Sequence, residues 1–379
     1  FVRYPRATMR TPRRLALAAA ALALPFLAGS PARAENPATI GGDQLAARGV
    51  VVPAGAPALP ATTAAGWVVA DLDTGAVLAA KNPHGQYAPA STLKTLTAET
   101  LIPKLDRAAM VTPTWADVNV DGSKVGLVSS VRYPVSELFT SMLVVSGNDA
   151  ALALATANGG IGKTVHEMNL EAQRLQAQDT VAVNDNGLDA HGQYSSAYDL
   201  ALIARAAMKL PDFREYVATK HAHIRGAKPH TAIAISSHDR LLYNYPGAIG
   251  IKNGYTVAAR ASFVGAATRG GHTLVVTLMR TNPRYWPEAA ALLDWGFRAT
   301  AAGASGVGQL VDPVDETQST SSAAQPVPAQ RVTKVATTQS GDGLPVMPAA
   351  IVAVGVLVMG SGVLRSRRRQ RGKLKLPPL

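Results

Sequence analysis

The most informative stretch of this sequence is Ala88-Pro89-Ala90-Ser91-Thr92-Leu93-Lys94. It places a hydroxyl and an amine three residues apart, which on a helix brings both to one face, one turn apart. A serine becomes a nucleophile only with a base within hydrogen-bond distance, and a buried lysine with a lowered pKa can be that base. Pro89 indicates that a helix begins here, so unpaired backbone N–H groups could stabilise an oxyanion beside Ser91. The segment therefore predicts acyl transfer.

Two later segments strengthen this prediction: Ser146-Gly147-Asn148 and Lys252-Asn253-Gly254. The order S-x-x-K, S-x-N, K-x-G is the signature set of penicillin-binding proteins and class A β-lactamases. Taken singly, the three segments are also typical of a capped helix, a helix-to-loop turn and an Asn-Gly hairpin corner. Because S-x-x-K and S-x-N each occur once and in this order, the set favours a serine acyl-transfer enzyme.

Both ends of the chain resemble targeting segments. Residues 1–34 are predicted to be a signal peptide, with Met9 as the more natural initiator and Ala32-Arg33-Ala34 as the cleavage site. The apolar run 346–364 is long enough to cross a bilayer as a helix, and the basic tail 365–379 marks its cytoplasmic side. We therefore expect a single-pass protein of the cell membrane, with its catalytic domain outside the cell and facing the cell wall.

The formal net charge of +12 reflects these ends and not a nucleic-acid surface. Six of the 37 basic residues precede residue 35 and seven follow residue 364, whereas none of the 25 acidic residues lies in either end. The central part of the chain is therefore close to neutral, and we expect no nucleic-acid partner. The absence of cysteine excludes disulfides, thiol catalysis and thiolate metal sites.

The pattern along the chain predicts one catalytic domain at residues 62–302. A flexible lead-in (35–61) precedes it and a disordered linker (303–345) follows. Strands are expected on both sides of the turn Asp73-Thr74-Gly75 and at 248–252, 261–267 and 273–279. Helices are expected at 91–105, 135–157, 197–208, where Pro211 would end the helix, and 287–297. Strands at both ends and helices between them predict an α/β (α+β) fold whose sheet is built from both ends of the domain.

The residues quoted above resemble those of low-molecular-mass penicillin-binding proteins, the serine D-alanyl-D-alanine carboxypeptidases of peptidase family S11. The resemblance covers about residues 62–300, extends to the stretches 87–94, 146–151, 186–189 and 196–201, and is similar to single-domain actinobacterial members. It implies the serine β-lactamase/DD-peptidase fold and an enzyme that trims the terminal D-alanine from peptidoglycan stem pentapeptides. It also implies acylation by β-lactam antibiotics and no metal or organic cofactor.

The resemblance further implies a role for each motif residue. Ser91 would attack the carbonyl between the last two D-alanines, Lys94 would take its proton, and Ser146 would relay that proton to the leaving amine. The backbone N–H groups of Ser91 and Tyr255 would form the oxyanion hole. Substrate binding would involve Asn148, Lys252, Asn253, Gly254, Tyr255 and Arg284, with Arg280 as the second choice for the arginine.

One motif position departs from the family pattern. The family has K-T-G or K-S-G, whereas the middle residue here is Asn253. An asparagine amide is longer than a threonine hydroxyl and also presents a carbonyl. We therefore expect weaker binding of the substrate carboxylate and not a loss of chemistry.

Three other functions remain as alternatives. A class A-like β-lactamase would need a glutamate to activate water, for which Glu167 and Glu171 are the candidates. A zinc peptidase could use the histidines of the later part of the chain, although this sequence contains no H-E-x-x-H motif. Those histidines are His221, His223, His230 and His238. A catalytically silent wall-binding protein is the third, prompted by Asn253. The sequence does not distinguish water from a second stem peptide as the acyl acceptor.

Overall fold

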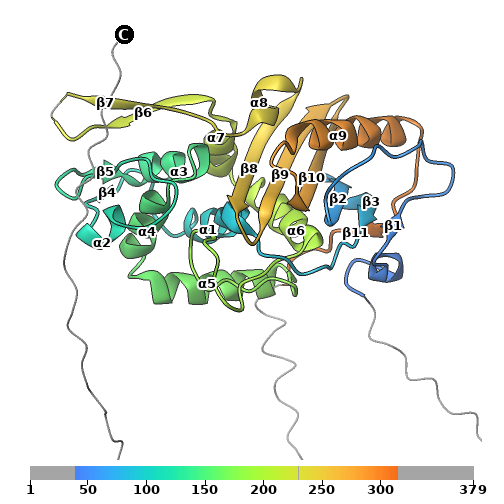
Figure 1. The fold of residues 1–379 in the computed structure, drawn as a ribbon, viewed down its shortest axis with the longest axis horizontal. Coiled ribbons are helices and arrows are strands. Elements are labelled where there is room, and N and C mark those ends of the chain that lie inside the picture. Colours follow the sequence, from blue (N-terminus) through green and yellow to red (C-terminus); the bar gives the residue numbers. More distant parts are fainter. Residues whose placement is uncertain (1–38, 229, 315–379) are drawn as a thin grey trace, which may run out of the picture. The chain divides into compact units, whose positions relative to one another are not determined.

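The computed structural model describes residues 39–228 and 230–314 (Figure 1). Its strands are β1 (Val50–Val51), β2 (Gly66–Asp71), β3 (Ala76–Lys81), β4 (Met110–Val111), β5 (Tyr133–Pro134), β6 (His221–Arg225), β7 (Ala232–Ser236), β8 (Ala248–Thr256), β9 (Arg260–Arg269), β10 (His272–Thr281) and β11 (Gly308–Gln309). Its α-helices are α1 (Lys94–Leu101), α2 (Trp115–Val118), α3 (Val135–Val144), α4 (Asn148–Ala157), α5 (Ile161–Arg174), α6 (Ala197–Ala207), α7 (Pro211–Ala218), α8 (Arg240–Asn244) and α9 (Trp286–Ala301). Short 3₁₀ helices are η1 (Asp43–Ala46) and η2 (Ala90–Leu93).

The main sheet is antiparallel and runs in the order β1-β3-β2-β10-β9-β8, with β11 also paired to β3. The predicted hairpin between β2 and β3 is confirmed. Its turn is fixed by Asp71, whose Oδ1 atom accepts hydrogen bonds from the backbone N–H groups of Asp73 and Thr74 at 2.9 and 2.8 Å. Because β8 to β10 come from the later part of the chain, the sheet is built from both ends of the domain, as the sequence predicts.

Helices cover both faces of the sheet (Figure 1), so its central strands are buried on both sides. In β2, Trp67 and Val69 point to the face covered by α9, whereas Val68 and Ala70 point to the face covered by α6. The helices α1 to α5 form a block beside the sheet, and η2 packs against β8 and β9. The predicted mixed α/β architecture is therefore correct.

The local structure differs from the predictions at two helix boundaries and agrees at a third. The stretch 135–157, expected to be helical, is divided into α3 and α4, because Ser146 has a φ of 62° and a left-handed residue ends an α-helix. The helix predicted over 197–208 is confirmed as α6, and Pro211 after its end lies at the first position of α7, where its missing N–H costs nothing. The α-helix expected from Ser91 begins only at Lys94, after the 3₁₀ helix η2.

The folded domain also extends beyond the predicted bounds of 62–302. Within the expected lead-in, Leu45 is fully buried and β1 pairs with β3. Within the expected linker, Leu310 is fully buried and β11 pairs with β3. These apolar residues stand in runs of one to three next to Gly, Pro and polar residues, too short for their pattern to reveal that the sheet needs them.

The predicted signal peptide (1–34), membrane span (346–364) and basic tail (365–379) lie outside the described residues. Within residues 39–228 and 230–314, no helix combines the length and the apolar character that crossing a membrane requires.

Candidate active site

The serine and lysine of the first motif are brought together as predicted. Ser91 lies in η2, and Lys94 is the first residue of α1. Residues three apart are eclipsed in a 3₁₀ helix, so the two side chains project in the same direction. The Nζ atom of Lys94 lies 3.0 Å from the Oγ atom of Ser91, which is within the range of a hydrogen bond. This is the geometry that an activated serine needs.

Lys94 is fully buried and makes two further hydrogen bonds. Its Nζ atom donates to Asn148 Oδ1 at 2.7 Å and to the carbonyl oxygen of Asn186 at 2.6 Å. Burial, together with the positive charge of Lys252, lowers the pKa of Lys94 well below its ordinary value, although Asp185 and Asp149 act in the opposite direction. A lysine in this environment can serve as a base near neutral pH.

Asn148 is buried and has both ends of its side-chain amide engaged within the protein. Its Oδ1 atom accepts from Lys94, and its Nδ2 atom donates to the carbonyl oxygen of Asp121 at 2.7 Å. A Cβ atom at Gly122 would lie 2.6 Å from this Nδ2 atom, so the glycine permits the close approach. In this structure Asn148 thus joins α4 to the base on α1, a contact that its predicted role in substrate binding did not include.

Ser146 lies between α3 and α4 and is 5% exposed. Its left-handed backbone costs about 1–2 kcal/mol for a residue other than glycine. Nearby, at the start of α4, the carboxylate of Asp149 accepts hydrogen bonds from the backbone N–H groups of Val125, Gly126 and Leu127 at 3.0, 2.9 and 3.0 Å. These bonds fix the neighbouring loop over the second motif.

The third motif lies on β8, directly against the nucleophile. A Cβ atom at Gly254 would lie 2.6 Å from the backbone nitrogen of Ser91, closer than real Cβ atoms approach. The hydroxyl of Ser262, on the neighbouring strand β9, donates to the carbonyl oxygen of Pro89 at 2.5 Å. The glycine of K-x-G therefore allows the strand to pass beside Ser91.

Lys252 is 1% exposed, and its Nζ atom donates to the carbonyl oxygen of Asn253 at 2.8 Å. Burial lowers the pKa of Lys252 to about 7, and the negative charge of Asp239 opposes this effect. The side chain of Asn253 is half-buried, and Tyr255 is 60% exposed. The motif strand thus runs from the protein interior to the surface.

Arg284 and Arg280 are exposed residues at the end of β10. The backbone N–H of Arg284 donates to Asn282 Oδ1 at 3.1 Å. Within the described part of the chain, no hydrogen bond or ion pair connects the guanidinium group of either arginine to a motif residue. Close contacts join Ser91, Lys94, Asn148 and Gly254 to one another, whereas no hydrogen bond in the described part of the chain joins the side chain of Ser146, Asn253 or Tyr255 to them.

The structure adds a loop that the sequence-based list of site residues missed. The carbonyl oxygen of Asn186 accepts from Lys94, and Gly187, with a φ of 82°, lies so close to Ala90 that a Cβ atom would overlap its carbonyl oxygen. Asp185, in the same loop, is buried with both carboxylate oxygens lacking a hydrogen-bond partner within the described residues. The Asn-Gly pair signals a turn, but nothing in the sequence indicates which side chain it meets.

The glutamates of the β-lactamase alternative have partners of their own on α5. Glu167 accepts a hydrogen bond from Asn158 Nδ2 at 2.7 Å and lies 3.2 Å from Lys104 Nζ. Glu171 pairs with Arg174 on the same helix. Neither glutamate has a contact with Ser91 or Lys94 among the interactions of the described residues.

The four histidines of the zinc alternative do not gather into a site. Among the described residues, the one grouping with metal-ligand geometry is His84, Asp179 and Asp199. In this cluster Nδ1 of His84 lies 2.7 Å from Asp179 Oδ2, and Nε2 lies 3.1 Å from the carbonyl oxygen of Ile40. Because both ring nitrogens face acceptors, His84 is best satisfied as a doubly protonated cation, which has no free lone pair for a metal.

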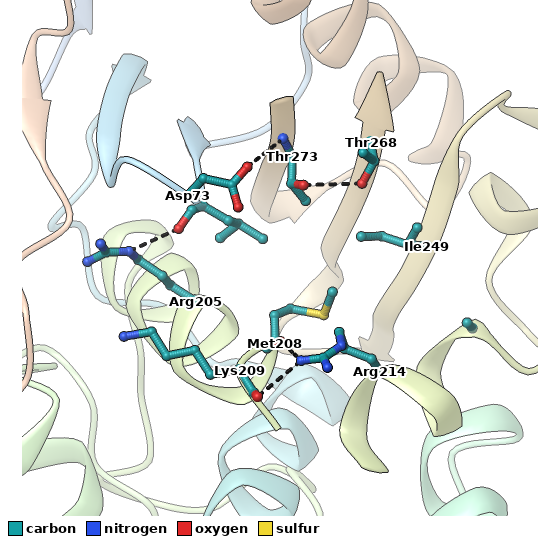
Figure 2. Close-up of a pocket in the computed structure, with 10 residues that line it drawn as sticks. Asp73, Arg205, Met208, Lys209, Arg214, Ile249, Thr268 and Thr273 are labelled. Atoms are coloured by element: carbon teal, nitrogen blue, oxygen red, sulfur yellow. Dashed lines mark hydrogen bonds between the residues drawn. The ribbon is translucent and has the colours of Figure 1, made fainter. Parts of the chain in front are cut away.

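A cavity of about 570 Å³ lies away from the three motifs, between α6, α7 and the sheet (Figure 2). The basic side chains in its lining are those of Arg205, Lys209 and Arg214, and the two arginines donate hydrogen bonds to backbone carbonyl oxygens. Arg205 donates to the carbonyl oxygen of Leu72 at 3.1 Å, and Arg214 donates to those of Met208 and Lys209 at 2.8 and 3.0 Å (Figure 2). These contacts hold the end of α6 and the turn after β2, so we assign the cavity no part in the chemistry.

Comparison with known proteins identifies relatives of the whole domain. The family model described as D-alanyl-D-alanine carboxypeptidase, Peptidase S11, matches residues 53–282. D-alanyl-D-alanine carboxypeptidase DacB2 of Mycobacterium tuberculosis is 42% identical over 254 residues, covering 65% of this chain and 87% of that protein. DacD of Escherichia coli is 33% identical over 257 residues, and the match covers 63% of this chain and 64% of that longer protein.

Solved structures agree with these relatives. A penicillin-binding protein homologue from Mycobacterium tuberculosis superposes with a TM-score of 0.65 at 42% identity, covering 70% of this chain and all of that one. The Streptomyces K15 DD-transpeptidase superposes with a TM-score of 0.60 at 28% identity, covering 64% of this chain and 99% of that one. The mixed α/β fold is therefore the DD-peptidase fold.

Proposed function

The chain belongs to the D-alanyl-D-alanine carboxypeptidases of peptidase family S11, which are serine DD-peptidases, and within this family we propose that Ser91, Lys94 and Ser146 carry the catalysis. The observation that supports the proposal most directly is the 3.0 Å separation of Lys94 Nζ and Ser91 Oγ, at a lysine that is fully buried. Burial favours the neutral amine, and the neutral amine is the form that can accept the serine proton.

The proposed reaction is cleavage of the bond between the last two D-alanines of a peptidoglycan stem peptide. Ser91 Oγ attacks the carbonyl carbon, and its proton passes to Lys94 Nζ. The oxyanion is stabilised by the backbone N–H groups of Ser91 and Tyr255. The C–N bond then breaks, the leaving amine receives the proton by way of the Ser146 hydroxyl, and water hydrolyses the acyl-enzyme. β-Lactams react at the same serine and form a stable ester.

Substrate binding is proposed to depend on the β8 strand. The ammonium group of Lys252 attracts the terminal carboxylate of the peptide, and the Asn253 amide donates a hydrogen bond to it. Gly254 lets β8 pass directly beside Ser91 and so brings the strand to the bound peptide, and Asn148 holds the base and borders the site. Arg284 is the least supported member of this set, because no hydrogen bond or ion pair among the described residues joins its side chain to the motifs.

We also propose that residues 346–364 anchor the protein in the cell membrane after removal of residues 1–34, with the catalytic domain outside the cell. The support is in the sequence: an apolar run of spanning length is followed by a basic tail. Fractionation of cells that express the full chain or a chain ending at residue 343 tests this proposal. Recovery of both forms in the soluble fraction would contradict it.

The catalytic proposal is tested by intact-mass spectrometry of the purified full chain after incubation with benzylpenicillin. We expect a stable adduct of the mass of penicillin, located on the peptide that contains Ser91, and no adduct on the matched Ser91→Ala variant. Absence of an adduct with intact penicillin would contradict the proposal. Destruction of penicillin without an adduct would support the β-lactamase alternative instead.

A further inference from the structure

A buried carboxylate that has no place in the mechanism above lies beside the third motif. Asp239 precedes α8 and caps it, with its Oδ1 atom accepting from the backbone N–H of Leu241 at 2.8 Å. Its Oδ2 atom is buried and has no hydrogen-bond partner within the described residues. A helix cap requires only one acceptor oxygen, and an asparagine or a serine supplies it as well. The cap therefore does not explain why a charged residue occupies this position.

The positive charge that acts on Asp239 is that of Lys252, although no ion pair within 4.0 Å joins the two side chains among the described residues. Both side chains are almost fully buried, α8 packs on β8, and the two residues interact electrostatically. The Lys252 ammonium has three N–H donors, of which the carbonyl oxygen of Asn253 accepts one. A buried charge without a partner is costly, so each of these groups reduces the cost of burying the other.

The loop that carries Asp239 is fixed to the second motif as well. The backbone N–H of His238 donates to the carbonyl oxygen of Val144 at 3.0 Å, two residues before Ser146. The imidazole of His238 also interacts electrostatically with Lys252. The carboxylate is therefore held on a loop that bridges the end of α3 and the K-x-G strand.

We propose that Asp239 is a positioning residue of the active site: its buried carboxylate is the counter-charge that allows Lys252 to present an ammonium group to the terminal carboxylate of the substrate. The inference rests on the proposed role of Lys252 in substrate binding. It assigns Asp239 no contact with the reacting atoms, because the residue acts through Lys252.

With Asp239 in this role, two buried lysines of one site keep different charge states. The charged or titratable groups that interact with Lys252 are Asp239, Lys94 and His238, and Asp239 is the one among these three that favours the cation. A charged Lys252 in turn repels a proton on Lys94 and keeps that residue a base. Removal of the Asp239 charge therefore lowers the fraction of Lys252 that is protonated, and with it the fraction of Lys94 that is neutral.

The test is the pH dependence of acylation in Asp239→Asn, which keeps the cap and the shape of the side chain but removes the charge. Burial lowers the pKa of Lys252 to about 7 against the opposing effect of Asp239, so loss of that opposition moves the alkaline limb of the profile to lower pH. A shift of about one pH unit corresponds to a roughly tenfold lower second-order acylation rate at pH 8, with little change near pH 5.5. The KM for a peptide ending in D-Ala-D-Ala should rise in parallel with the loss of acylation.

Asp199→Asn is the matched control, because Asp199 is also a buried carboxyl whose pKa is raised by burial, to about 7, but its charged neighbours are Asp179 and His84. We expect it to keep the wild-type alkaline limb. If Asp239→Asn does not fold, Asp239→Ser also caps the helix without a charge and gives the same test. Superimposable profiles of wild type and the folded Asp239 variant would overturn the inference. Failure of the wild-type protein to be acylated at any pH would instead overturn the proposed function.

Discussion

Lys94 donates a hydrogen bond to the side-chain oxygen of Asn148 over 2.7 Å, so the proposed base is held by a residue of the second motif. This contact predicts that Asn148→Ala lowers kcat more than it raises KM, because the lysine loses a partner that fixes its position opposite Ser91. A displaced base costs roughly 100-fold or more in rate. Steady-state hydrolysis of a D-Ala-D-Ala peptide measures both parameters.

Asn148→Asp is the informative companion variant for this contact. It keeps the shape of the side chain but places a negative charge 2.7 Å from Lys94 Nζ, which favours the protonated lysine. We expect the acid limb of its acylation profile to move to higher pH. A rise in KM with unchanged kcat in both variants would show that Asn148 acts on the substrate and not on the base.

Asp185→Asn should have the opposite effect on the acid limb. Burial raises the pKa of Asp185 to about 6, and above that pH its carboxylate favours the protonated form of Lys94. Removal of this charge makes the lysine easier to deprotonate, so the acid limb of acylation moves to lower pH. Measurement of the benzylpenicillin acylation rate between about pH 4 and pH 8 checks this; an unmoved limb would refute it.

Gly254→Ala should abolish most of the acylation. The added methyl group would lie 2.6 Å from the backbone nitrogen of Ser91, so β8 or η2 must shift and the nucleophile must move with it. We expect at least a 100-fold lower acylation rate, since displacements of about 1 Å have effects of this size. Gly162→Ala on α5 is the control, because a Cβ atom there meets nothing within 4 Å; equal rates in the two variants would contradict the prediction.

Asn253→Thr should raise the rate of acylation by penicillin several-fold. Threonine restores the family pattern and has a shorter side chain than asparagine. Its hydroxyl should therefore donate a stronger charge-assisted hydrogen bond to the carboxylate of penicillin, and bonds of this kind are worth about 1.5–3 kcal/mol. Asn253→Val has the shape of threonine without the hydroxyl and should show no gain. A similar gain in both variants would attribute the effect to side-chain size.

His84 should stabilise the fold in a pH-dependent way. Burial disfavours its charged form, but the hydrogen bond and charge of Asp179 outweigh burial and raise its pKa above 6.5. Because the folded-state pKa is the higher one, the contribution is fully present below about pH 6.5 and is lost as the pH rises through the folded-state value. Urea unfolding of His84→Gln should therefore show a cost of about 1–2 kcal/mol near pH 5.5 that shrinks by pH 8.5. A cost independent of pH would refute the charged form.

The sequence predicts the motif residues because their chemistry depends on local spacing. Ser91 and Lys94 meet within one turn, and the hairpin at Asp73-Thr74-Gly75 is encoded by its own turn residues. Asp185 and Asp239 could not be found in this way. Each meets its lysine through tertiary packing of a loop, and nothing in the sequence around either aspartate distinguishes a buried carboxylate from a solvated one. The left-handed Ser146 was missed for a related reason, since the apolar pattern of α3 and α4 continues across the break.

The pairing of β3 with strands from both ends of the domain has a practical consequence. Val50–Val51 covers β3 at Ala80 and Lys81, whereas Gly308–Gln309 covers it at Ala76 and Val77. A fragment cut to the family match at 53–282 would lack both strands and leave this backbone edge open to pairing with another molecule. Expression fragments should therefore retain residues 39–314, and a protease that removes either short strand would expose this edge and favour self-association.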